Sequence, residues 1–243
     1  MNQQLEQLIK YASLNAKDAR NCKIEQHAAL FALITRAVID AKGEDDGKDS
    51  IIKAITKYAE ERGARMAETA RANGDEINIA TFVAYGEWQA EEGEKEDVIE
   101  QQTPSFVTNT ILCPWNEAWK KHGLEEFGRY YCVTVDDALW RGFSPGDECT
   151  VASTLTWGGD KCRFDWNKPM SDDDFSGLVK KQKELGTTFK RDFNYHTAHL
   201  LNTVFEYLID KYSNEGVDMV SHALKEFTEL FSEDYLVSLI GKY

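Results

Sequence analysis

Apolar residues recur every three or four positions through the first third of the chain. Between residues 5 and 84 they follow the spacing of one helix face, which is typical of amphipathic α-helices. Two glycines flank an acidic triplet at residues 43–47, a composition that favours a turn between helices. The pattern therefore predicts a helical N-terminal region. We interpret the acidic stretch that follows, residues 87–100, as a solvated helix face or a loop.

The pattern changes to short runs rich in β-branched and aromatic residues between about residues 104 and 166. Residues 106–112 and 150–157 have the composition of strands, and Gly158-Gly159-Asp160 is typical of a hairpin turn into residues 161–166. Every second residue of that last run is apolar, as in a strand buried on one face. Residues 128–137 fit a strand and a helix equally well.

Helical spacing returns after Pro169 and continues to Tyr243. The order of elements predicts an α+β fold, with a small, mainly antiparallel sheet from the middle of the chain flanked by N-terminal and C-terminal helices. We predict a helical region at residues 1–100, a sheet-containing core with the cysteine motifs at residues 101–170, and C-terminal helices packing on that core at residues 171–243, all within one compact unit.

The charge balance argues against nucleic acid as a partner. The chain has 28 basic and 42 acidic residues and a formal net charge of −14, which repels a phosphate backbone. The N-terminus lacks the pattern of a signal peptide, and no apolar run approaches the roughly 20 residues of a membrane span. Five cysteines, an odd number, argue against a disulfide framework. We therefore expect a cytoplasmic protein with reduced thiols that binds neither nucleic acid nor a membrane.

The tripeptide Cys113-Pro114-Trp115 is a candidate for chemistry. The residue before a proline favours extended geometry, and proline is favoured at the first helical position. We therefore expect Cys113 to end a strand at the start of a helix over residues 115–122, which Gly123 terminates. The helix dipole lowers the pKa of a thiol in that position, which suits a nucleophile or a metal ligand. A buried structural cysteine is the alternative.

A second candidate is the segment Tyr195–His199. His196 and His199 are three residues apart on a predicted helix, so they share one face and can hold a metal, or one can act as a base that the other orients. Two ordinary helix histidines are the alternative. Cys132 and Asp136, four residues apart, also share one side of a helix or strand. No phosphate-binding loop, GxSxG elbow or GxGxxG fingerprint is present.

Several of these residues form a pattern that resembles the L-2-amino-thiazoline-4-carboxylic acid hydrolase family. The pattern comprises Cys113-Pro114-Trp115, Tyr131-Cys132 with Asp136, Gly142-Phe143 with Pro145, Ser153-Thr154-Leu155, Gly159-Asp160, Cys162-Arg163-Phe164, and the histidine motif of longer members at Tyr195–His199. The Gly-Asp-x-Cys-x-Phe ending also resembles 4-vinyl reductase domains, which are small-molecule binding modules. Those domains usually carry another cysteine shortly before the Gly-Asp, where this chain has Thr154-Leu155-Thr156-Trp157.

The resemblance implies a hydrolase that opens a cyclic amidine, converting a 2-amino-thiazoline carboxylate to a carbamoyl-cysteine. Two mechanisms satisfy that chemistry. In one, Cys113 is the nucleophile and His196 or His199 the acid/base. In the other, a divalent metal ion held by some of His196, His199, Cys132 and Asp136 activates water. A binding or sensory module of the 4-vinyl reductase kind, without turnover, is the alternative function.

The implied partner is a small-molecule substrate with a negative charge. Among the arginines of the motif region, Arg163 is our candidate for gripping a carboxylate, with Arg129 and Arg141 as others. We expect Trp115 and Tyr131 to line the substrate pocket together with Cys132 and Asp136, although the two aromatic residues also suit a core. A homodimer through the helical ends is the default expectation for oligomeric state.

Overall fold

Two units of packed segments make up the chain, and the computed structural model describes all residues from 1 to 243. The first unit comprises Met1–Tyr58, Trp115–Val133 and Asp192–Tyr243. The second comprises Ala59–Pro114 and Thr134–Arg191. Both units collect segments from several of the stretches distinguished in the sequence. The order of element types along the chain therefore does not mark where one unit ends and the other begins.

The first unit is helical. Its elements are α1 (Gln3–Ala12), α2 (Ile24–Lys42), the beginning of α3 (Glu44–Ala72), α5 (Pro114–His122), α6 (Glu125–Gly128), the 3₁₀ helix η1 (Arg129–Val133), α9 (Phe193–Tyr212), α10 (Asn214–Leu230) and α11 (Glu233–Val237). Helix α2 packs against α9 and α10, and most of its side chains are buried. A helix that is apolar nearly all round belongs in the centre of its unit, and α2 fits that rule.

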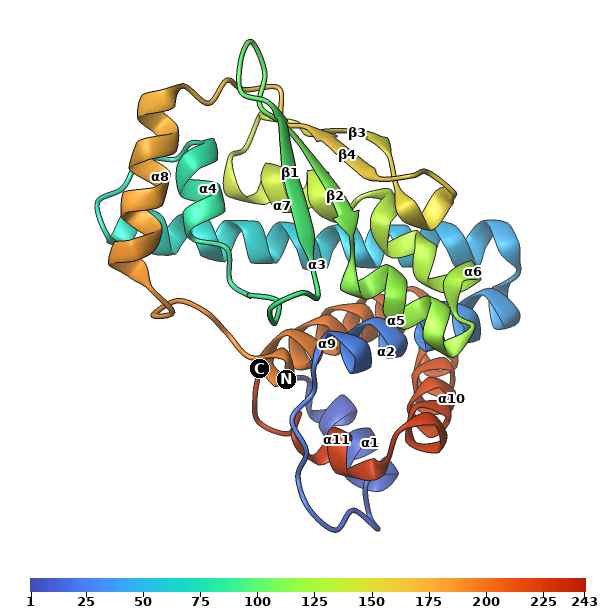
Figure 1. Cartoon of the computed structure of the whole chain (residues 1–243). Helices are drawn as coiled ribbons and strands as arrows, with labels where there is room; N and C mark the ends of the chain where they lie inside the picture. Colours follow the sequence, from blue (N-terminus) through green and yellow to red (C-terminus); the bar gives the residue numbers. More distant parts are fainter. The chain divides into compact units, whose positions relative to one another are not determined.

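The second unit contains the sheet. Its elements are the rest of α3, α4 (Ile79–Ala84), β1 (Glu96–Gln101), β2 (Val107–Leu112), α7 (Val135–Phe143), β3 (Thr150–Ser153), the 3₁₀ helix η2 (Leu155–Trp157), β4 (Cys162–Asp165) and α8 (Asp172–Leu185). The strands are ordered β1-β2-β4-β3, and all neighbours are antiparallel. Figure 1 shows the strands together with α7 and α3. The predicted α+β class, with a small antiparallel sheet between helical ends, is confirmed.

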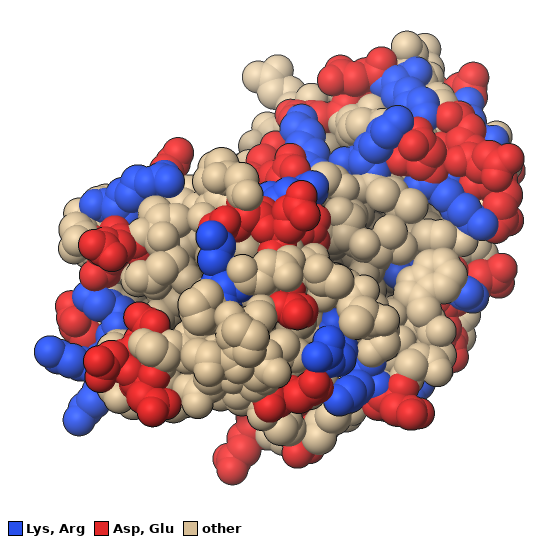
Figure 2. Space-filling model, turned by 90° about the horizontal axis from the view of Figure 1, so that it is seen from above, with Lys and Arg blue, Asp and Glu red and all other residues tan.

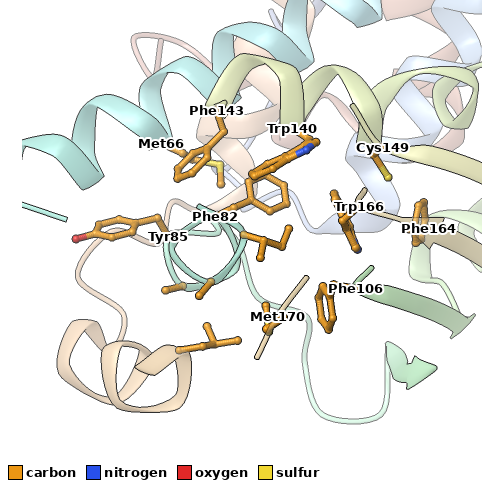
Figure 3. Close-up of a cluster of buried hydrophobic side chains, with 14 of the residues drawn as sticks. Met66, Phe82, Tyr85, Phe106, Trp140, Phe143, Cys149, Phe164, Trp166 and Met170 are labelled. Atoms are coloured by element: carbon orange, nitrogen blue, oxygen red, sulfur yellow. The ribbon is translucent and has the colours of Figure 1, made fainter. Parts of the chain in front are cut away.

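One face of the sheet carries the core of the second unit. Phe164 and Trp166 project from the end of the sheet toward Phe82 and Trp140, and the rings of Phe82 and Trp166 lie 5.3 Å apart (Figure 3). Helices α3, α4, α7 and α8 supply the rest of this core. The opposite face bears polar side chains, among them Arg163. The alternation predicted for residues 161–166 is therefore confirmed, because Cys162, Phe164 and Trp166 are all buried.

Helices α3 and α7 are in backbone contact. A Cβ atom added to Gly63 would lie 2.1 Å from the carbonyl oxygen of Leu139, and one added to Gly142 would lie 2.3 Å from that of Glu60. Only glycine fits at both positions, since a side chain on either would force the helices apart. This close approach brings the last turns of α7 alongside the middle of α3.

Several predicted elements are confirmed, including the helix after Cys113, the hairpin turn at residues 158–160 and the helical C-terminal part. Residues 128–137, which fit a strand and a helix equally well, are helical. Two stretches differ from the prediction: the run at residues 150–157 leaves the strand after Ser153, and the acidic stretch ends in strand β1. All six residues of β1 are exposed, so it lacks the apolar alternation by which a strand is recognised.

Two further features of the structure concern the distribution of surface charge and the length and polarity of the helices. Figure 2 shows acidic side chains spread among basic ones over the face that it displays, without an extended basic patch. None of the helices combines the length and the apolar character needed to cross a membrane.

Candidate functional site

A cavity of about 510 Å³ lies within the second unit. Small-molecule sites are typically about 300–1,000 Å³, so its size suits a small organic ligand. Its walls come from α3, α4, the loop after α4, the beginning of β1, α7 and the end of α8. The lining combines apolar side chains with charges of both signs, namely Met66, Phe82, Val83, Trp88 and Leu139 with Arg62, Glu87, Lys95, Asp97 and Lys190.

Asp136 lies on α7 close to this cavity. Leu139, three residues later on the same helix face, is part of the cavity wall. The residue as a whole is half-buried, and burial of its carboxyl raises the pKa to about 6, a rise that Lys95 and Arg62 oppose and Asp97 reinforces. A carboxyl that titrates near neutrality can both accept and donate a proton under physiological conditions. The predicted site residue Asp136 therefore has the electrostatics of an acid/base group.

Cys113 lies at the end of β2, directly before the proline that begins α5. Its side chain is half-buried. Burial raises the pKa of the neighbouring thiol Cys162 to about 11, and the negative charges of Cys113 and Asp136 add to that rise. Both groups therefore lie within electrostatic reach of one thiol on β4. Two of the residues predicted from the sequence, Cys113 and Asp136, therefore lie in the same unit and act electrostatically on the same thiol.

The other cysteines divide by burial. Cys22, Cys149 and Cys162 are buried, whereas Cys113 and Cys132 are half-buried. Burial raises the pKa of Cys22 to about 12 and raises that of Cys149 further. A thiol with a raised pKa is a poor nucleophile at neutral pH. The buried three therefore have the character of structural cysteines.

Arg163 lies on the face of the sheet opposite the core. Its guanidinium forms an ion pair with Glu100 at 2.9 Å, and Lys161 and Asn109 contact the same carboxylate. Arg141 pairs with Glu60 at 3.3 Å. The cationic groups that line the cavity are Arg62, Lys95 and Lys190 instead.

The first unit contains a cluster of buried imidazole and aromatic rings. His27 of α2 is its centre, with Nδ1 3.3 Å from Thr197 Oγ1 and Nε2 3.4 Å from the hydroxyl of Tyr131. The rings of Trp115 and Phe193 lie 6.0 and 5.6 Å from that of His27. Trp115 and Tyr131, both predicted to line a substrate pocket, therefore surround a histidine that the sequence did not single out.

His196 and His199 are buried in α9 of the same unit. The ring of His199 stacks on Tyr243 at 4.2 Å and lies 4.8 Å from that of Tyr58, while the ring of His196 lies 5.5 Å from Phe193. The predicted helix is confirmed, and both imidazoles are buried in it.

The predicted site residues thus fall in both units. Cys113, Asp136 and Arg163 belong to the second, and the first contains Trp115, Tyr131, Cys132, His196 and His199. No group of three or more histidine, cysteine, aspartate or glutamate side chains is arranged to hold a metal ion.

The sequence did not reveal the charged lining of the cavity. Lys95 and Asp97 lie in the acidic stretch that we interpreted as a helix face or loop, and Arg62 is one of several charged residues of α3. Lys190 lies in a polar segment between two helices. No local signal marks these residues, because charged side chains in an acidic stretch or on an exposed helix are too common to indicate a site.

Comparison with known proteins gives one match. The family model described as L-2-amino-thiazoline-4-carboxylic acid hydrolase matches residues 23–166, more than half of the chain. The matched span contains Cys113, Asp136, Arg62 and Lys95, and it ends before His196. No curated protein and no solved structure matches the chain significantly.

Proposed function

Because this chain belongs to the L-2-amino-thiazoline-4-carboxylic acid hydrolase family, we propose that it opens a small cyclic amidine carboxylate by hydrolysis in the second unit. Cys113 is the proposed nucleophile, and Asp136 is the group that moves the proton. The observation that carries this assignment is the carboxyl of Asp136, whose pKa burial raises to about 6 beside a cavity of ligand size. The family's name, that of a hydrolase, supports the reaction class.

The first half of the reaction uses Asp136 as a base and then as an acid. The carboxylate takes the proton of the Cys113 thiol as sulfur attacks the amidine carbon of the ring. The bond between that carbon and the ring nitrogen then breaks. The departing nitrogen takes one proton from Asp136 and a second from the exocyclic amino group, which becomes the imine of the open product. The ring is now open, and its former amidine carbon is bonded to the Cys113 sulfur.

The second half releases the product. Asp136, again a carboxylate, takes a proton from water as the water oxygen attacks the carbon attached to Cys113. The carbon–sulfur bond to Cys113 breaks, and the thiolate recovers the proton. For 2-amino-thiazoline-4-carboxylate the product is a carbamoyl-cysteine, one water heavier than the substrate.

Two alternatives to Asp136 as the group that transfers the proton and activates the water are also proposed. His196 or His199 is the acid/base in one. In the other, His196, His199, Cys132 and Asp136 are the candidate ligands of a divalent metal ion, which would supply an activated water, but no three such side chains are arranged to hold a metal. The first alternative makes one of these histidines essential, whereas the proposed mechanism makes Asp136 essential, so variants of His196 and Asp136 separate these two. Asp136 is itself a candidate ligand in the second alternative, which is tested instead by removing metal with a chelator.

Turnover of 2-amino-thiazoline-4-carboxylate, followed by mass spectrometry, tests the proposal. The wild type is compared with Cys113→Ala, Asp136→Asn and His196→Ala, with Asp173→Asn on the exposed side of α8 as a control. We expect a product one water heavier from the wild type and the control, and none from the Cys113 and Asp136 variants. Full activity of Asp136→Asn with loss in His196→Ala would transfer the proton step to the histidine. Ligand binding without turnover would favour the binding-module alternative.

A further inference from the structure

Lys190 differs from the other cationic residues of the cavity. Lys95 is paired with Asp97, and Arg62 lies 3.6 Å from a carboxylate oxygen of Glu87. Lys190 also lines the cavity, yet its ammonium group has no carboxylate within ion-pair distance. It donates a hydrogen bond to the carbonyl of Gly86, and two of its three N–H donors stay available.

The carboxylate whose charge acts on Lys190, that of Glu87, already forms ion pairs with arginines. Arg65 donates to both oxygens of Glu87, at 2.7 and 2.8 Å, and Arg191 lies 3.5 Å away. Glu87 therefore offers Lys190 only long-range stabilisation. Burial lowers the pKa of Lys190, and Glu87 opposes that shift. A partly desolvated cation without a close counter-ion gains most from a ligand that brings a negative charge.

The segment around Lys190 is fixed in place. The backbone N–H of Arg191 donates to the carbonyl of Glu87 at 2.7 Å, and Lys190 itself holds the carbonyl of Gly86. Residues 190–191 are therefore attached to the loop that forms one wall of the cavity. Attachment at two points orients the lysine before a ligand arrives, which reduces the entropy lost on binding.

The rest of the cavity suits a flat ring next to that charge. Phe82, Trp88 and Leu139 supply apolar surface, and Asp97 supplies a negative charge at the beginning of β1. A cyclic amidine carboxylate has these parts: a ring, a cationic or hydrogen-bonding amidine, and a carboxylate.

We infer that Lys190 is the specificity-determining residue that binds the carboxylate of the ligand, in place of the arginines of the motif region. This inference rests on the proposed function for the choice of ligand. It adds a residue outside the span that the family model matches.

Two substrates that differ by one carboxylate test the inference: 2-amino-thiazoline-4-carboxylate and 2-amino-thiazoline itself. Each is assayed with the wild type, Lys190→Gln, Lys190→Arg and the control Lys183→Met, which alters an exposed lysine of α8. Glutamine keeps an N–H donor for the Gly86 carbonyl but has no charge, so it separates charge from a structural role. Thermal unfolding of each variant is measured in parallel.

The expected result is a KM for the carboxylate that rises about tenfold or more in Lys190→Gln, as for loss of a charged hydrogen bond. The KM for the ring without a carboxylate stays within about twofold of the wild type, and Lys190→Arg restores most of the discrimination. An equal effect of Lys190→Gln on both substrates, or no effect on either, would overturn the inference.

Calorimetric binding of the same two compounds separates this inference from the proposed function. If the wild type turns over neither compound but binds the carboxylate more tightly, and Lys190→Gln loses that preference, the function fails and the role of Lys190 stands. If the wild type binds neither compound, the inference is overturned along with the proposed substrate class.

Discussion

Gly142 of α7 and Glu60 of α3 lie so close that a Cβ atom on Gly142 would be 2.3 Å from the Glu60 carbonyl oxygen. The contact sets the spacing of the two helices that place Asp136 and Arg62 at the cavity. We predict that Gly142→Ala destabilises the fold by about 2–3 kcal/mol, as for an overpacked core. Urea unfolding measures this change.

Gly177 on α8 provides the matched control, since a Cβ atom there meets nothing within 4 Å. Gly177→Ala is expected to stabilise the protein by about 0.5–1 kcal/mol, because alanine restricts the unfolded chain. Equal effects of the two substitutions on the free energy of unfolding would show that α3 and α7 can move apart without loss of stability.

Asp136 is expected to reduce stability at neutral pH. Its pKa is about 6 in the folded chain against 3.8 ordinarily, so the folded state binds the proton more tightly. The resulting stability is fully present below about pH 4 and is lost as the pH rises through about 6. A shift of this size is worth up to about 3 kcal/mol, and the partial exposure of the residue reduces it. We predict that Asp136→Asn raises the free energy of unfolding at pH 7 by about 1–2 kcal/mol.

Urea unfolding of wild type and Asp136→Asn at pH 7 and pH 4 checks this prediction. The difference between the two proteins should shrink at the lower pH, because the wild-type carboxyl is then protonated in the folded state and partly protonated in the unfolded state. A variant that is less stable than the wild type at pH 7 would contradict it.

The pH dependence of kcat/KM should show the titration of the Asp136 carboxyl. The mechanism starts from the carboxylate of Asp136, so activity is expected to fall as the pH drops below about 6. Lys95 opposes the rise in the pKa of Asp136, and Lys95→Met should therefore move the acid limb to higher pH. Lys161→Met, on the opposite face of the sheet, should leave the limb in place. If the acid limb of the Lys95→Met profile is unchanged, Asp136 is not the group whose titration causes it.

Thiol reactivity should follow burial. Iodoacetamide at neutral pH is expected to modify Cys113 and Cys132 well before Cys22, Cys149 and Cys162, whose pKa values burial raises. Peptide mass spectrometry after short exposures measures the order. In addition, 2-amino-thiazoline-4-carboxylate should slow the reaction of Cys113 selectively. Preferential modification of Cys162 would contradict the assignment of the buried cysteines as unreactive.

The sequence predicts an element correctly where the local residue pattern is itself the physical cause of the structure. Alternation at Cys162, Phe164 and Trp166 marks β4 because one face of that strand is buried. The proline after Cys113 marks the beginning of α5 because its geometry suits the first helical turn. Strand β1 escaped prediction because all six of its residues are exposed and its two apolar residues, Val98 and Ile99, are adjacent rather than alternating, so its extended form depends on pairing with β2.

The candidate site was predictable only in part. Cys113 and Asp136 were singled out by spacing and resemblance, and both lie in the second unit. Arg62, Lys95 and Lys190 were not, since helical periodicity identifies apolar faces but not which charged side chains meet at a cavity. His27 was passed over because its partners Tyr131 and Thr197 are more than a hundred residues away.

The most direct test of the central claim is the mass of the protein stopped by acid during turnover of 2-amino-thiazoline-4-carboxylate. The account predicts a transient adduct with the mass of the substrate on the peptide that contains Cys113, decaying as a product one water heavier forms. Cys113→Ala should form neither adduct nor product. A product that forms at the wild-type rate in Cys113→Ala, with no adduct in the wild type, would contradict the account.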